Sequence, residues 1–217
     1  SILSGCGYLD GSEAHEAIFS LLALDQAGAQ VQCFAPDTDQ RDVVDHQTGQ
    51  PVEGARRNCR TEAARLSRGN VADVAQARAA DFDALVLPGG YGAAKNLCSY
   101  AVDGTSASVH PEVARVIREF SAAGKPIGAI CISPMLVAAV LGKEKSPTLT
   151  IGNDAATARD LETFGARHSE CPPGEACVDA ANRVVTTPAY MYESRPAEVF
   201  RGIQKLVQEV LVLSEAR

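Results

Sequence analysis

Hydrophobic positions along the chain follow two different periods. Short, almost continuous apolar runs next to Gly, Pro or Lys predict buried strands at 31–35, 84–87, 127–130, 149–151, 176–179 and 184–187. Apolar residues three or four positions apart predict helices at 13–26, 111–123, 134–141, 155–164 and 196–213, the first of them capped by Ser12. Ile2 and Leu3 have the character of the end of a further strand.

Strands and helices alternate along most of the chain, which is the order of a parallel sheet. We therefore expect one domain, residues 1–217, with an α/β fold: a flavodoxin-like three-layer sandwich whose central sheet is mostly parallel and has helices on both faces. Residues 37–78 form an irregular insertion, with a short strand at Val43–Val44 and a helical turn or two at 62–67. Such a segment either contributes to function or covers a sheet edge or an oligomer interface.

Composition narrows the class of protein. Apolar residues make up 46% of the chain and the net charge is −7, which argues against nucleic acid or an anionic membrane surface as the main partner. The longest apolar runs are too short to span a membrane, and no secretory signal is visible.

The seven cysteines include no Cys-x-x-Cys pair, so we expect free thiols and a cytoplasmic location. The four histidines do not pair with cysteines at ligand spacing, so we expect no metal and no cofactor.

Cys131 is the first candidate for chemistry. Ligands of an open parallel sheet bind outside the carboxyl ends of its strands. Cys131 directly follows the strand 127–130 and precedes Ser133-Pro134, which opens a helix. A cysteine there lies on a sharp turn near a helix N-terminus, which favours the reactive thiolate. A buried structural cysteine is the usual alternative, but this position favours a nucleophile.

Two further loops reach the same edge. Gly89 and Gly90 end the strand 84–87, and their amides, with that of Ile132, could stabilise negative charge on an attacked carbonyl oxygen. Glu13 and Glu16 lie one turn apart in the first helix, where a carboxyl group could exchange protons with the cysteine. For Glu13, a favourable interaction with the helix dipole is the better explanation.

Motifs in register lie at 4–16, 34–37, 41–46, 84–97, 124–134 and 184–190. Together they resemble the ThiJ/PfpI superfamily of class I glutamine amidotransferase-like proteins, and among these the ElbB branch (glyoxalase ElbB, or enhancing lycopene biosynthesis protein). The resemblance covers nearly the whole chain and implies Cys131 as the nucleophile, Glu16 as its carboxylate partner and a homodimer. It implies glutathione-independent glyoxalase (lyase) activity on a small reactive carbonyl, methylglyoxal or glyoxal, giving a hydroxy acid.

Two departures from that superfamily concern proton transfer and the turn. Relatives with protease-like or amidotransferase activity have a histidine that assists the cysteine, whereas here Ile132 follows Cys131 and no histidine follows the strand 149–151. Proton transfer would then depend on Glu16 and water. His15 and His168 have no assigned role, and Ser133 replaces a glycine that many relatives have.

Two other functions are compatible with the same residues. One is a redox-responsive stress protein in which Cys131 is oxidised to a sulfinic acid stabilised by Glu16, with Cys6 as a resolving thiol. The other is a regulatory role linked to isoprenoid biosynthesis, which only the name of the ElbB branch suggests.

Overall fold

Three apolar strands lie side by side and parallel at the centre of the fold. In the computed structural model, which describes residues 1–216, β5 (Leu85–Leu87) pairs with β6 (Ile127–Ile130), and β6 pairs with β10 (Val184–Thr187). β9 (Cys177–Asp179) joins β10 in the antiparallel direction. Every residue of the three parallel strands is buried, as expected for strands that have helices on both faces.

The start of the chain connects these strands to the second part of the sheet. Ile2 forms a parallel bridge with β1 (Cys33–Ala35), and its N–H donates to the carbonyl oxygen of Val86 at 3.1 Å. β4 (Val71–Asp73) pairs with β1 in the parallel direction. The strand order is therefore β4, β1, residues 1–3, β5, β6, β10 and β9.

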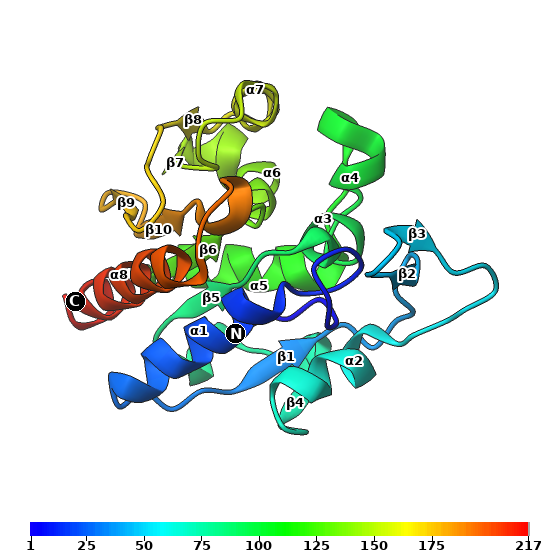
Figure 1. Ribbon diagram of the computed structural model, residues 1–217. Coiled ribbons are helices and arrows are strands. Elements are labelled where there is room, and N and C mark those ends of the chain that lie inside the picture. Colours follow the sequence, from blue (N-terminus) through cyan, green and yellow to red (C-terminus); the bar gives the residue numbers. More distant parts are fainter. Residues whose placement is uncertain (217) are drawn as a thin grey trace.

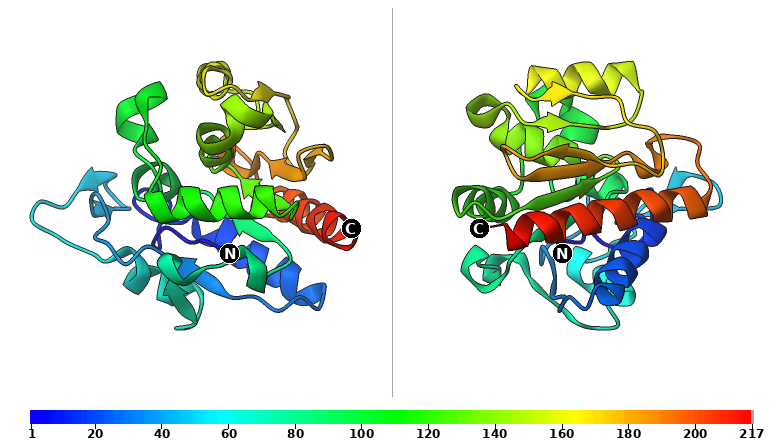
Figure 2. Two further views of the ribbon diagram at one scale, coloured as in Figure 1. Left: turned by 180° about the vertical axis from the view of Figure 1, so that it is seen from behind. Right: turned by 90° about the vertical axis from the view of Figure 1, so that its left-hand side faces the viewer.

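Helices cover both faces of this sheet, which confirms the α/β fold with a mostly parallel sheet that the sequence predicts. α5 (Pro111–Ala122) and α6 (Pro134–Lys145) pack on one face. α1 (Ala14–Gln26) and α8 (Pro196–Glu215) pack together on the other, where α8 lies against β6 and β10 (Figures 1 and 2). Neighbouring residues enter opposite apolar clusters, as the two-residue period of a strand requires: Leu85 and Val86 in β5, Ala129 and Ile130 in β6, and Val184 and Val185 in β10.

The segment 37–78 is more regular than the sequence predicts. It begins with a hairpin of β2 (Val44–Asp45) and β3 (Gln50–Pro51), followed by α2 (Cys59–Leu66) and β4. The expectation of an irregular insertion is wrong for 59–73, because β1, α2 and β4 form one more strand–helix–strand unit. β4 has only three residues, one of them charged, and so gives no recognisable strand pattern.

No helix within residues 1–216 combines the length and the apolar composition needed to cross a membrane.

Short elements complete the part of the chain that is described. The short helices and strands are α3 (Tyr91–Lys95), α4 (Tyr100–Asp103), β7 (Thr148–Leu149), α7 (Ala155–Thr163) and β8 (Arg167–His168), with 3₁₀ helices η1 (Val74–Gln76), η2 (Ala79–Asp81), η3 (Gly104–Ser106) and η4 (Ala189–Met191).

Candidate active site

Cys131 lies in a strained turn between β6 and α6. Its φ of 61° is in the left-handed region, which residues other than glycine rarely adopt and which is frequent at functional sites. The N–H of Cys131 donates to the carbonyl oxygen of Thr187 at 2.9 Å. The hydroxyl group of Ser133 donates to the carbonyl oxygen of Pro88 at 2.7 Å. Ser133 therefore does more than replace a glycine: it ties this turn to the loop after β5.

Glu16 is fully buried beside this cysteine. Its carboxyl group hydrogen-bonds the Cys131 side chain and accepts the N–H of Gly89 at 2.9 Å and that of Tyr190 at 3.5 Å. Burial, and then the charge of Glu13, raise the pKa of Glu16 to about 8, although these hydrogen bonds act in the opposite direction. The carboxyl group can therefore gain and lose a proton near neutral pH, as a general acid or base must.

The thiol of Cys131 is buried as well. Burial and the neighbouring Glu16 carboxylate raise the pKa of this thiol, whereas hydrogen bonds from the N–H groups of Gly90 and Ile132 lower it. When Glu16 is protonated, the repulsion disappears and the carboxyl group can donate to the sulfur. Cys131 and Glu16 therefore titrate as one coupled pair.

The loop after β5 packs so closely on this pair that only glycine fits. A Cβ atom at Gly89 would lie 2.5 Å from the Cβ of Cys131 and 2.6 Å from Oε2 of Glu16. Gly90 has a φ of 93°, and a Cβ atom there would lie 2.3 Å from a backbone nitrogen at the start of α1. The amides of Gly90 and Ile132 face the sulfur, where the predicted oxyanion-type donors would be. The amide of Gly89 differs from that prediction, because it donates to Glu16.

Glu13 caps α1 and also lines the cavity next to Cys131. Its carboxylate accepts the N–H of Glu16 at 2.7 Å, and burial raises its pKa. The prediction of Ser12 as the helix cap is wrong, because the Ser12 hydroxyl oxygen accepts the N–H of Ser4 at 2.8 Å instead.

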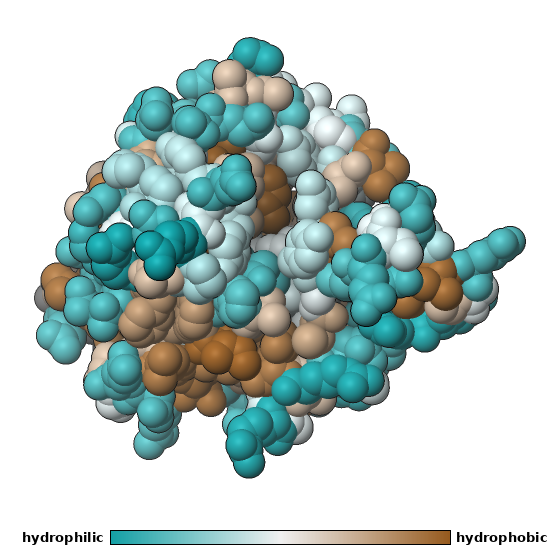
Figure 3. All heavy atoms as spheres, viewed as in Figure 1, coloured by the Kyte–Doolittle hydropathy of each residue, from teal (hydrophilic) through white to brown (hydrophobic). Residues whose placement is uncertain are grey.

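A cavity of about 440 Å³ opens over Cys131. The space-filling view shows this face of the molecule hollowed between α4 and α7, with apolar surface inside the hollow (Figure 3). Four of the five tyrosines in the chain line the cavity, and sequence reasoning missed all four as site residues. The available signal for two of them, Tyr8 and Tyr91, was their position in the loops already selected. The four are Tyr8, Tyr91, Tyr100 and Tyr190.

No histidine of the described chain lines this cavity. His15 lies behind its wall, with Nδ1 2.8 Å from the hydroxyl oxygen of Tyr190 and the ring stacked on Phe19. His168 belongs to β8. The site therefore has no Cys–His pair, and Glu16 is the titratable group in contact with the sulfur.

Cys6 is not brought together with Cys131. It packs beside the apolar cluster that contains Leu3 and Cys59, and it does not line the cavity. Burial and the charge of Glu62 raise the pKa of Cys6. Its position gives no support to a resolving role.

Residues 1–216 contain no group of three or more His, Cys, Asp or Glu side chains that could hold a metal ion.

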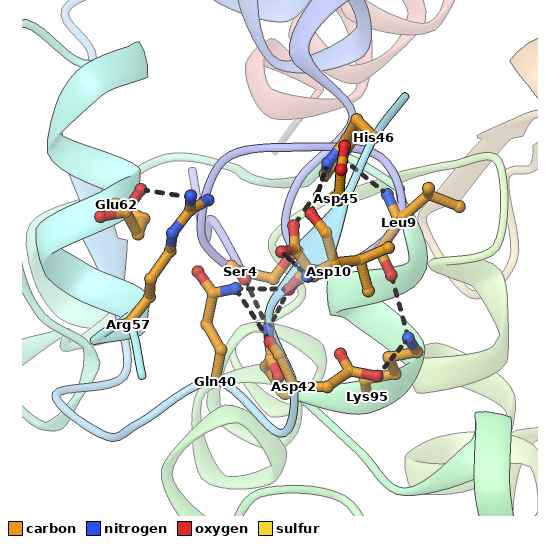
Figure 4. A network of polar contacts seen from close by, with 12 residues as sticks. Ser4, Leu9, Asp10, Gln40, Asp42, Asp45, His46, Arg57, Glu62 and Lys95 are labelled. Carbon is orange, nitrogen blue, oxygen red and sulfur yellow. Dashed lines mark hydrogen bonds and ion pairs between the residues drawn. The ribbon is translucent and has the colours of Figure 1, made fainter. Parts of the chain in front are cut away.

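A buried polar network holds the loop 4–13, which supplies Tyr8 and Glu13 to the cavity. Asp10 is fully buried at its centre, and its Oδ2 accepts the N–H of Val44 in β2 at 2.8 Å. The side-chain amide of Gln40 donates to the carbonyl oxygen of Asp10 at 3.0 Å (Figure 4). The loop is thus bonded directly to the insertion.

Lys95 at the end of α3 reinforces this attachment. Its Nζ donates to the carbonyl oxygen of Leu9 at 3.0 Å and forms an ion pair with Asp42 at 2.8 Å. Nε2 of His46 accepts the N–H of Leu9 at 3.3 Å. The first part of the insertion therefore positions one wall of the cavity, and β4 extends the sheet.

The nucleophile turn, its buried carboxyl partner and the parallel sheet together define the class of protein. The sequence profile of the DJ-1/PfpI family matches residues 7–191, and the chain belongs to this family.

Relatives resemble nearly the whole chain. The human protein "Glutamine amidotransferase-like class 1 domain-containing protein 3, mitochondrial" is 47% identical over 98% of this chain and 82% of its own length. The rat "ES1 protein homolog, mitochondrial" is 45% identical with the same coverage. A crystal structure from Ehrlichia chaffeensis, described as an isoprenoid biosynthesis protein with amidotransferase-like domain, has a TM-score of 0.92 at 40% identity, and the match covers 98% of this chain and 96% of that chain.

The prediction of a cytoplasmic location is wrong. The relatives from human, rat and Danio rerio are all named as mitochondrial proteins. The prediction depended on free cysteines, and all seven are indeed free. Free thiols indicate a reducing compartment, but they do not distinguish one reducing compartment from another.

Glu16 should make the stability of the protein depend on pH. The pKa of its carboxyl group is about 8 in the folded protein and 4.5 as the reference value, so the folded state keeps a proton that the unfolded chain loses between these values. The contribution of Glu16 to the free energy of unfolding should fall from about pH 4.5 to about pH 8, by at most about 1.4 kcal/mol per pH unit. Chemical denaturation across this range should show a shallower decline for Glu16→Gln. Equal slopes would contradict the raised pKa.

The network around Asp10 gives a second expectation. Asp10→Ala leaves the buried N–H of Val44 without an acceptor, so we expect the free energy of unfolding to fall by about 1–3 kcal/mol. Glu53→Ala, at an exposed position just after β3, should change it by about 0.5 kcal/mol or less. Urea denaturation of both variants measures the difference. A similar loss in the two proteins would show that the buried carboxylate has no special role.

Proposed function

We propose that this protein is a cofactor-independent glyoxalase-type enzyme, which converts methylglyoxal or glyoxal to a hydroxy acid without glutathione. The observation that carries the proposal is the coupled pair of Cys131 and Glu16 beside an open cavity. The pKa of Glu16, about 8, suits a group that moves protons at neutral pH.

The first step forms a bond between the sulfur of Cys131 and the aldehyde carbon. The thiol proton passes to the Glu16 carboxylate as the sulfur attacks, and Glu16 then gives this proton to the aldehyde oxygen, which completes a hemithioacetal and leaves Glu16 as a carboxylate again. The N–H groups of Gly90 and Ile132, which face the sulfur, would stabilise negative charge on that oxygen during the attack.

The second step moves hydrogen between the two carbons. Glu16 removes the hydrogen of the former aldehyde carbon as a proton, and the neighbouring carbon receives a proton in return. The hydroxyl proton passes to the neighbouring oxygen, which gives a thioester of the 2-hydroxy acid. Water then cleaves the bond between sulfur and carbon, releasing the acid and regenerating the thiol. For methylglyoxal the sum is one water added and lactate formed.

Oxidation of Cys131 is a second candidate function, and the protonated form of Glu16 favours it. A carboxylic acid beside the sulfur can donate a hydrogen bond to a sulfinate, which two equivalents of peroxide would form with release of two waters. The ElbB likeness, a link to isoprenoid biosynthesis and a homodimer stay predictions. The isoprenoid description of the Ehrlichia chaffeensis structure is in keeping with that link.

Purified protein should consume methylglyoxal and form lactate in the absence of glutathione. Cys131→Ser should abolish turnover, and Glu16→Gln should lower kcat by about 10²–10⁴-fold, the usual contribution of a general acid–base group. Cys6→Ser is the matched control, because this cysteine does not line the cavity, and its turnover should equal that of the wild type.

An inactive wild type would refute the enzyme proposal. If, in that case, peroxide adds two oxygens to Cys131 before it modifies the other cysteines, as intact and peptide mass spectrometry would show, the redox function replaces it. Retained turnover in Cys131→Ser would exclude Cys131 as the nucleophile.

A further inference from the structure

The cavity over Cys131 is larger than a three-carbon substrate requires. Its volume of about 440 Å³ lies within the range of about 300–1,000 Å³ that is typical of pockets for drug-sized ligands. Methylglyoxal bonded to Cys131 would leave most of this space to water. The size therefore indicates a substrate with a larger group attached to the reacting carbons.

The walls are aromatic, and two of the rings are held in place. The hydroxyl group of Tyr100 donates to Asp160 at 2.8 Å, and that of Tyr190 lies at hydrogen-bond distance from His15. Tyr8 and Tyr91 are about half exposed, at 48% and 53%, on the same cavity. Aromatic side chains bind apolar and aromatic groups through their faces and edges, and rings fixed in advance lose little freedom on binding.

The charges around the cavity have one sign. Glu13 and Asp154 line it, and no lysine, arginine or histidine among the described residues does. The pKa of Asp154 is lowered by hydrogen bonds from Thr157, so this carboxylate is ionised at neutral pH. Lys95 lies 5.9 Å from the centre of the Tyr91 ring, but it forms an ion pair with Asp42. A carboxylate or phosphate group on the substrate would meet like charge and no counter-ion.

We propose, on the basis of the glyoxalase-type function above, that the substrates of this site are 2-oxoaldehydes that carry an apolar or aromatic group on the keto carbon and no negative charge. Methylglyoxal is then the smallest member of the class, and aldehydes that carry a carboxylate or phosphate are excluded.

Phenylglyoxal and methylglyoxal test the size and the aromatic walls. Phenylglyoxal should have a kcat/KM about tenfold or more above that of methylglyoxal, measured as mandelate and lactate formed, since burying a large apolar group yields at least this factor. Tyr91→Ala should lower the ratio of the two kcat/KM values. Tyr192→Ala, which removes a tyrosine outside the cavity, should leave the ratio unchanged. Equal or lower kcat/KM for phenylglyoxal would overturn the proposal while the glyoxalase function stands.

Two alkylating reagents test the charge without requiring turnover. Iodoacetamide is neutral and iodoacetate is an anion of similar size, so their rates at Cys131, followed by peptide mass spectrometry, report on the field in the cavity. Relative to a free cysteine peptide, iodoacetate should be disfavoured by about tenfold or more, which corresponds to about 1.4 kcal/mol. Asp154→Asn should reduce the preference of Cys131 for iodoacetamide over iodoacetate.

These outcomes separate the two proposals. A protein that prefers iodoacetamide but converts neither oxoaldehyde has the proposed selectivity at Cys131 without the glyoxalase function. A protein that forms lactate but shows no preference between the reagents has the function without the selectivity, and the inference on charge is then overturned.

Discussion

The hydrogen bond between Glu16 and Cys131 is the interaction around which the rest of the site is arranged. Both side chains are buried, so their polar atoms need partners within the protein. The loop after β5 supplies one partner through the amide of Gly89, and it comes close enough only because positions 89 and 90 have no side chain. The strained turn at Cys131 brings the sulfur to the same point. Three segments that are far apart in the sequence are thereby fixed together at the end of the sheet: α1, the loop after β5 and the turn at Cys131.

The carboxyl group of Glu16 is important because no histidine of residues 1–216 lines the cavity. In the described structure, Glu16 is the titratable side chain that contacts the sulfur, and burial brings its pKa into the range where it can exchange protons. The strain in the turn and the raised pKa both cost stability, which the apolar clusters on the two faces of the sheet offset. Membership of the DJ-1/PfpI family is shown by the sequence, whereas the reaction depends on this local arrangement.

Sequence reasoning found the centre of the fold and the residues nearest to the sulfur. Buried parallel strands are continuous apolar runs, and a cysteine between such a run and Ser133-Pro134 is a local signal. β4 was missed because a strand of three residues gains its stability from pairing with β1 and leaves no pattern of its own. The tyrosines of the cavity and the network around Asp10 come from loops that only the folded chain brings together. The cap of α1 was misplaced because Ser12 bonds to Ser4, a contact that local sequence does not reveal.

The attachment of the loop 4–13 to the hairpin of β2 and β3 separates two properties of the site. The reactivity of the sulfur is set by the β6–α6 turn and Glu16, whereas part of the cavity wall is held by residues of the insertion. Changes in the hairpin can therefore reshape the entrance without altering the nucleophile. For protein engineering, this makes the insertion the natural place to introduce diversity in a library that aims at new substrates with the chemistry kept constant.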